Sequence, residues 1–129
     1  LGYAYPTALG AKVAFPDRKV LSISGDGGFM FAVQELSTAV AHGIDLVAIV
    51  MNDGAFGNVK RIQQTAYGGR MIGVDLHNPD FVALAESFGM LGLRAESPVA
   101  LRAAFVAVAG GKQAEKAVDH AGRTIDRRS

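Results

Sequence analysis

The stretch Val20-Leu21-Ser22-Ile23-Ser24-Gly25-Asp26-Gly27-Gly28 carries the strongest indication of the fold. It begins as a short apolar run with β-branched residues, which is typical of a buried strand, and it ends in glycines and an acid that favour a turn. A second apolar run, Leu46 to Met51, ends in the same way at Asn52-Asp53-Gly54. Two such runs with a helical segment between them predict a β-α-β unit and therefore a parallel sheet.

Helical patterns surround both strands. Pro6 is expected to open a helix that ends at Pro16-Asp17, and a second helix is expected over residues 29–42, with Gly43 just beyond its C-terminal end. A third helix is expected over residues 56–64. This alternation of strands and helices predicts an α/β fold with three layers, α/β/α, around a mostly parallel sheet.

The C-terminal half begins with a glycine-rich segment, residues 65–77, that we expect to be an exposed loop. Asn78-Pro79-Asp80 then predicts the start of a helix, with the asparagine as its N-cap. Residues 91–95 are expected to form a short strand, and Ser97-Pro98 is expected to open a last amphipathic helix.

Composition indicates a folded domain, and because the sequence begins at Leu1 inside a Gly/Pro-rich turn without an initiator Met, we expect it to be an internal or C-terminal piece of a longer polypeptide. Of the 129 residues half are hydrophobic, and the net charge of +1 gives no electrostatic reason to expect a nucleic-acid or membrane partner. The absence of cysteine excludes disulfides and zinc–thiolate sites, and we expect a cytoplasmic protein. Residues 112–129 are polar and poor in large apolar groups, so we expect a domain over residues 1–111 followed by a tail that is either a frayed helix or disordered.

Two acids follow the two predicted strands directly, Asp26 after the first and Asp53 after the second. Ligands of open α/β sheets bind at this edge, where the carboxyl ends of parallel strands meet. The glycines beside each acid allow backbone N–H groups to approach a phosphate. Because Mg²⁺ prefers a few carboxylate and carbonyl oxygens together with phosphate oxygens, the pattern indicates a magnesium-bridged phosphate site.

Other interpretations of these motifs stay open at this point. Gly-Asp-Gly and Asp-Gly are common in structural turns. A dinucleotide fingerprint is incomplete because Met30 stands where the third glycine belongs, although Asp53 could serve as the ribose-binding acid of a Rossmann-like nucleotide-binding domain. A third possibility is a catalytically inactive domain that is kept for assembly.

The combination of motifs resembles the thiamine diphosphate-binding signature, a Gly-Asp-Gly followed some two dozen residues later by a pair of asparagines. Leu1-Gly2-Tyr3-Ala4-Tyr5-Pro6-Thr7-Ala8-Leu9-Gly10-Ala11-Lys12 is similar to the segment that precedes this signature in acetolactate synthase-like and benzoylformate decarboxylase-like enzymes. Gln34-Glu35-Leu36 and the run from Asn52 to Gly57 match the same group. The resemblance extends from Leu1 to about Val108 and implies the family's C-terminal, diphosphate-binding domain.

Carried over residue by residue, the resemblance implies three metal ligands: the Asp26 and Asp53 side chains and the backbone oxygen of Ala55. Gly27 and Gly28 match the turn whose N–H groups meet the diphosphate, and Leu1 matches the apolar residue that keeps the cofactor bent. The full cofactor-binding set implied by the resemblance is Leu1, Gly25, Asp26, Gly27, Gly28, Asp53, Ala55, Phe56 and Gly57. Because the family usually has a neutral asparagine where this chain has Asp53, we expect cofactor binding to depend strictly on metal.

The resemblance also implies thiamine diphosphate and Mg²⁺ as cofactors and a 2-oxo acid as the substrate of a decarboxylase or carboligase. The glutamate that activates the cofactor is expected in a pyrimidine-binding domain, usually of a partner subunit in a homodimer or homotetramer. We therefore assign no catalytic residue to this chain and expect the isolated segment to be inactive. The family's last apolar strand has no match in residues 112–129, so the sheet is expected to lack it.

Overall fold

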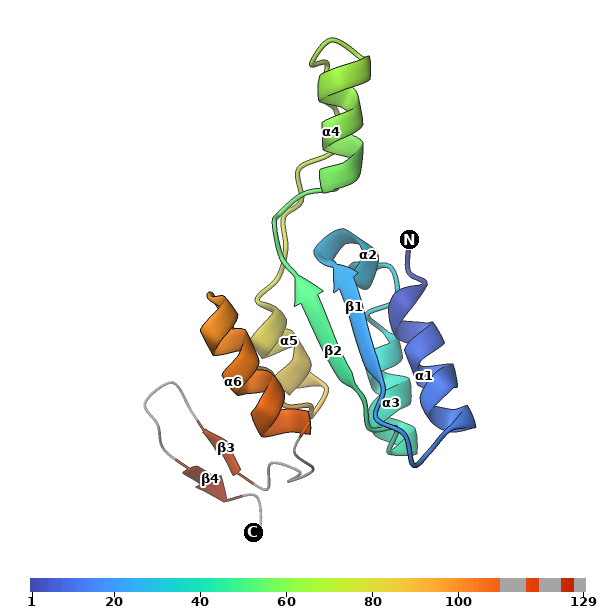
Figure 1. Ribbon diagram of the computed structural model, residues 1–129, viewed down its shortest axis with the longest axis vertical. Coiled ribbons are helices and arrows are strands. Elements are labelled where there is room, and N and C mark those ends of the chain that lie inside the picture. Colours follow the sequence, from blue (N-terminus) through green and yellow to red (C-terminus); the bar gives the residue numbers. More distant parts are fainter. Residues whose placement is uncertain (110–115, 119–123, 127–129) are drawn as a thin grey trace. The chain divides into compact units, whose positions relative to one another are not determined.

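The computed structural model describes residues 1–109, 116–118 and 124–126, and the chain divides into two compact units, Leu1–Asp80 and Phe81–Ser129. The first unit contains α1 (Ala4–Ala14), β1 (Leu21–Gly25), α2 (Asp26–Met30), α3 (Glu35–His42), β2 (Val47–Met51) and α4 (Gly57–Ala66) (Figure 1). The second contains α5 (Phe81–Ser87), α6 (Pro98–Ala109), β3 (Lys116–Val118) and β4 (Thr124–Asp126).

The first unit is built on a parallel pair of strands, as predicted. β1 and β2 run side by side in the register that places Leu21 opposite Val47 and Gly25 opposite Met51 (Figure 1). Both strands therefore end at the same edge, and the loops that follow them begin next to each other. Parallel neighbours joined through helices confirm the α/β class.

Helices α1 and α3 lie on one face of this strand pair and contact each other (Figure 1). The buried apolar residues are mostly small or aromatic and come chiefly from α1, α2 and α3: Tyr5, Ala8, Leu9, Phe29, Ala32, Leu36, Ala39 and Val74. Along β1, Ser22 is buried while Leu21 and Ile23 are 42% and 60% exposed. The prediction of a buried strand is therefore wrong for one face of β1, because α1 and α3 cover only the other face within this unit.

The Tyr5 side chain lies at the centre of this core. Its ring meets Phe29 edge to face at a centroid distance of 5.7 Å, and its hydroxyl is buried without a hydrogen-bond partner among the described residues. Burial raises the pKa of Tyr5 above its usual 10.0, and the nearby Glu35 carboxylate adds to the rise. Both causes disfavour the phenolate inside the folded unit.

The helix predicted over residues 29–42 is broken into α2 and α3. The carbonyl of Gly28 accepts a hydrogen bond from the Gly2 N–H at 3.2 Å, so it is taken by the N-terminal segment. The Ala32 N–H, which would reach that carbonyl in a continuous α-helix, donates instead to Phe29 O at 3.0 Å. Further bonds of this tighter, three-residue spacing carry the chain to α3. The helix thus breaks at the point where the N-terminal segment bonds to its backbone.

Two helix ends that depend on neighbouring residues lie where the sequence predicted them. Gly43 follows α3 in the left-handed conformation with φ of 59°, and the Ile44 N–H returns to Ala39 O at 2.9 Å, as in a Schellman motif. In the second unit, the Ser97 hydroxyl accepts a hydrogen bond from the Ala100 N–H at 3.1 Å and so caps α6.

Two other expectations for the C-terminal half are corrected. Helix α5 begins at Phe81, later than the predicted start at Asn78. Residues 91–95 form no strand, and Gly92 lies so close to α5 that a Cβ there would come within 2.8 Å of the Val82 carbonyl oxygen. In the tail, β3 pairs antiparallel with β4, with Ala117 opposite Ile125. The expectation of a frayed helix or disorder over residues 112–129 stays a prediction.

The other tail residues, 110–115, 119–123 and 127–129, lie outside the described part, and the domain boundary at residue 111 stays a prediction. None of the helices in the described part of the chain has the length and hydrophobicity of a transmembrane segment.

Candidate functional site

The Asp26 carboxylate lies at the shared end of the two parallel strands. It opens α2 directly after β1 and is 1% exposed. One oxygen, Oδ1, accepts the Gly27 N–H at 2.8 Å, and the other, Oδ2, accepts the Gly54 N–H at 2.8 Å. Oδ2 also accepts the side-chain amide of Asn78 at 2.5 Å. The carboxylate thus joins the loops that end β1 and β2.

The hydrogen bonds around Asp26 define what this carboxylate can still bind. All three donors are neutral, so the buried negative charge meets dipoles but no opposite charge among them. A carboxylate has about four lone-pair sites, and two on Oδ2 and one on Oδ1 are used. The remaining lone pair belongs to Oδ1. A buried carboxylate of this kind is a chemically suitable partner for a cation.

The loop after β2 brings Asp53 to the start of α4. Asp53 is exposed, and its Oδ1 accepts the Ala55 N–H at 3.2 Å. Its other oxygen, Oδ2, lies so close to Gly57 that a Cβ there would be 3.0 Å away. The glycine at the first position of α4 therefore leaves room for this carboxylate, and the positive end of the helix is a favourable place for it.

Ala55 is held by a short antiparallel bridge to Asp75. The Phe56 N–H donates to Val74 O at 2.8 Å, and the Leu76 N–H donates to Gly54 O at 2.8 Å. An ion pair of 2.7 Å between Lys60 and Asp75 links α4 to the same bridge. Neither bridge hydrogen bond uses the Ala55 carbonyl, so this oxygen can serve as a ligand.

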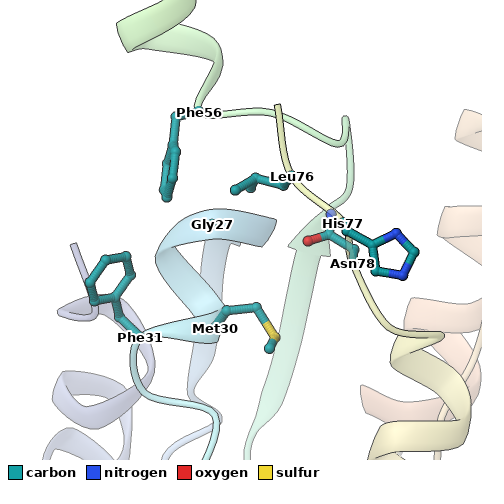
Figure 2. A pocket seen from close by; sticks show the side chains of 7 residues that line it. All are labelled: Gly27, Met30, Phe31, Phe56, Leu76, His77 and Asn78. Atoms are coloured by element: carbon teal, nitrogen blue, oxygen red, sulfur yellow. The ribbon is translucent and has the colours of Figure 1, made fainter. Parts of the chain in front are cut away.

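A pocket of about 290 Å³ lies beside these groups (Figure 2). Its lining comes from α2, the residues just after it and the two bridged segments: Gly27, Met30, Phe31, Phe56, Leu76, His77 and Asn78. Figure 2 shows the Phe56 ring pointing down toward Gly27 and the Leu76 side chain reaching across above it. A Cβ on Gly27 would lie 2.4 Å from the Phe56 ring and 3.0 Å from Leu76, so that any larger residue here requires one of these side chains to move.

Asn78 is the residue that the sequence interpretation missed. Its side-chain nitrogen donates to Asp26 Oδ2 and also, at 2.8 Å, to Asn52 Oδ1, and the side chain borders the pocket (Figure 2). The Asn-Pro-Asp pattern predicted an N-cap, and no local signal in the sequence distinguishes a capping asparagine from one that reaches back to a site 52 positions earlier.

The remaining predicted residues lie around this centre. Gly25 ends β1 with extended backbone (φ −72°, ψ 158°), and a Cβ added at Gly28 would meet nothing within 4 Å. Leu1 is 83% exposed, and the neighbouring Gly2 bonds to Gly28. No group of three or more His, Cys, Asp or Glu side chains forms a metal site in the described part of the chain, whereas the ligand set expected above has two carboxylates and otherwise backbone and phosphate oxygens.

Comparisons with known proteins identify the family of this chain. The family model described as thiamine pyrophosphate enzyme, C-terminal TPP binding domain matches residues 1–118. The acetolactate synthase of Bacillus subtilis is 49% identical over 98 residues, which are 76% of this chain and 17% of the relative. A probable acetolactate synthase large subunit of Methanococcus aeolicus is 44% identical over 99 residues, 76% of this chain and 16% of the relative.

A solved structure extends the likeness to three dimensions. The thiamine diphosphate-dependent 4-hydroxybenzoylformate decarboxylase of Rhodococcus jostii RHA1 aligns with a TM-score of 0.80 and 32% identity, over 85% of this chain and 21% of that one. The chain therefore spans about a fifth or less of each of these relatives. The match over residues 1–118, together with the strand-end carboxylates and the α/β fold, means that this chain belongs to the thiamine pyrophosphate (thiamine diphosphate) enzyme family, as its C-terminal cofactor-binding domain.

Proposed function

We propose that this chain binds the diphosphate of thiamine diphosphate through a Mg²⁺ ion, within an enzyme that decarboxylates or condenses 2-oxo acids. The observation that carries the proposal is the Asp26 carboxylate, which is 1% exposed and surrounded by neutral donors at the shared strand end. Such a group is suited to a hard divalent cation.

The residues present fit the cation and its phosphate. Oδ1 of Asp26 has a lone pair left, Asp53 provides a second carboxylate on the adjacent loop, and the Ala55 carbonyl lies outside the bridge hydrogen bonds. The Gly27 N–H is already donated to Asp26, so the N–H of Gly28 is the better candidate to meet the diphosphate. Phe56 and Leu76 would cover the cofactor's apolar part from the pocket side.

When bound, the cofactor supplies a nucleophilic carbon and an electron sink. The role of this chain is to hold the diphosphate, to fix the cation and to exclude water on one side. We assign no proton-transfer residue to it, and we propose that the activating glutamate comes from a pyrimidine-binding domain of a second subunit. The 2-oxo acid substrate is supported by the structural relative, because 4-hydroxybenzoylformate is a 2-oxo acid.

Calorimetry on the full-length protein tests the proposal. Thiamine diphosphate is expected to bind in the presence of Mg²⁺ and to lose its binding in excess chelator. Equal binding in the chelator would contradict the metal bridge. Tight NAD binding without Mg²⁺ would favour a nucleotide-binding domain instead, and binding of neither ligand would favour a domain kept for assembly.

A further inference from the structure

We propose that Asn78 is a positioning residue that makes the cation site selective for Mg²⁺ over Ca²⁺, an inference that rests on the proposed function. Its side-chain nitrogen bridges Asp26 Oδ2 at 2.5 Å and Asn52 Oδ1 at 2.8 Å. Because an ionised carboxylate only accepts hydrogen bonds, the amide group that faces it must be the NH₂. Both of its hydrogens are then used, one on each strand-end loop.

This bridge decides which oxygen of Asp26 is available. Oδ2 accepts both Asn78 and the Gly54 N–H, so its two lone pairs are used. Oδ1 accepts the Gly27 N–H and keeps one lone pair. Asp26 can therefore offer a cation a single oxygen, and it cannot turn to offer both without breaking the bond to Asn78.

Single-oxygen ligation favours the smaller ion. Mg²⁺ requires a near-ideal octahedron of six oxygens at short distance, whereas Ca²⁺ accepts six to eight oxygens in irregular geometry and often takes both oxygens of one carboxylate. Holding Asp26 to one oxygen thus matches Mg²⁺ and removes an advantage of Ca²⁺. Selectivity between these two ions depends on such limits on ligand number and flexibility.

Asn78 is itself well fixed. It follows the bridge in which the Leu76 N–H donates to Gly54 O at 2.8 Å. The next residue is Pro79, which restricts the backbone of the residue before it. The side chain of Asn78 therefore extends from a constrained segment of the chain and can hold the Asp26 carboxylate in one orientation.

The test is titration of the full-length protein with Mg²⁺ alone and with Ca²⁺ alone, in the wild type and in Asn78→Ala. Removing an outer partner of a metal ligand typically weakens metal binding about 10- to 100-fold, and we expect a loss of this size for Mg²⁺. Ca²⁺ affinity is expected to fall less, because the freed carboxylate can offer both oxygens. The ratio of the two affinities should therefore move toward Ca²⁺.

Two further variants sharpen the result. Asn58→Ala removes an exposed amide on α4 whose oxygen accepts a hydrogen bond from Arg61 at 3.0 Å, and it should leave both affinities unchanged. Asn52→Ala removes one of the two acceptors of Asn78 and should move the ratio in the same direction by a smaller factor. It also provides the readout if Asn78→Ala does not fold.

The outcomes separate this inference from the function on which it rests. If the wild type binds no Mg²⁺, even in the presence of thiamine diphosphate, the proposed function is wrong. If the wild type binds Mg²⁺ but the ratio is unchanged in whichever of the two variants folds, the positioning role is overturned. An equal loss of affinity for both ions would also overturn the positioning role, since a purely structural defect lowers both affinities together.

Discussion

Gly27 provides the sharpest prediction about packing at the site. A Cβ at this position would lie 2.4 Å from Phe56 Cε1, where ordinary contacts begin at 3.4 Å, so the ring must move by about 1 Å. The Phe56 backbone is anchored by its hydrogen bond to Val74 O at 2.8 Å, so that the ring can yield only by turning or by shifting α2. Overpacking of this kind typically costs about 1–3 kcal/mol, and we expect Gly27→Ala to destabilise the strand-end region by that amount.

Gly28→Ala is the matched control. It adds the same methyl group to α2, one position later, with nothing within 4 Å of the new Cβ. We expect no destabilisation from it, since an unstrained Gly→Ala typically stabilises a protein by about 0.4–1 kcal/mol. Because both substitutions reduce the freedom of the unfolded chain equally, the difference between them isolates the contact with Phe56.

Native-state hydrogen exchange of the α2 and β1 amides, in the full-length protein, measures this difference locally. A change of about 1–3 kcal/mol corresponds to a roughly 5- to 150-fold increase in the opening equilibrium. Equal exchange rates in Gly27→Ala and Gly28→Ala would refute the reasoning, because they would mean that the Phe56 ring moves aside at no cost.

Three further predictions follow from single contacts. Because the pKa of Tyr5 is raised in the folded protein, its contribution to stability is full below pH about 10 and is lost as the pH rises through the folded pKa. Tyr5→Phe should abolish this alkaline loss of stability, which thermal unfolding between pH about 8 and 11 measures. The same alkaline loss in wild type and variant would contradict a role for Tyr5. Asp53→Asn should weaken Mg²⁺ binding and make cofactor binding less sensitive to chelator, which calorimetry measures; unaltered Mg²⁺ affinity would remove Asp53 from the site. Gly43 has a φ of 59°, so Gly43→Ala should lower the local stability of α3 by about 1–2 kcal/mol, which hydrogen exchange measures. Gly10→Ala in α1, where an added Cβ would meet nothing within 4 Å, should not lower the stability of its helix. Equal effects of the two substitutions would contradict the role of backbone strain at Gly43.

Much of the fold could be predicted because its signals are local. The apolar runs that became β1 and β2, the glycine that ends α3 and the serine that caps α6 each act within a few residues of their own position. The strand pairing followed from the β-α-β order, and the position of Asp26 and Asp53 after the two strands followed from that pairing. The motif resemblance then predicted the family, which the match over residues 1–118 confirmed.

The predictions from the sequence were incomplete where a residue far along the chain forms a hydrogen bond with a group of the predicted element. Helix 29–42 is broken where the Gly2 N–H bonds to the Gly28 carbonyl, and the Asn78 amide donates to Asp26 and Asn52, two contacts that its predicted capping role did not include. Each of these contacts joins residues that lie 26 to 52 positions apart. Neither hydrophobic periodicity nor the turn preferences of single residues indicate a hydrogen-bond partner that lies so far away in the sequence.

By itself, the sequence determined the α/β class, the two strand ends and the residue types available there, because hydrophobic periodicity and glycine chemistry are properties of neighbouring residues. Only the tertiary structure decided how those residues are used: that Asp26 is buried and has one free lone pair, that Phe56 covers Gly27, and that Asn78 joins the two loops. The physical reason is that a hydrogen bond or a close contact depends on three-dimensional separation, which the folded chain sets only when its distant segments meet.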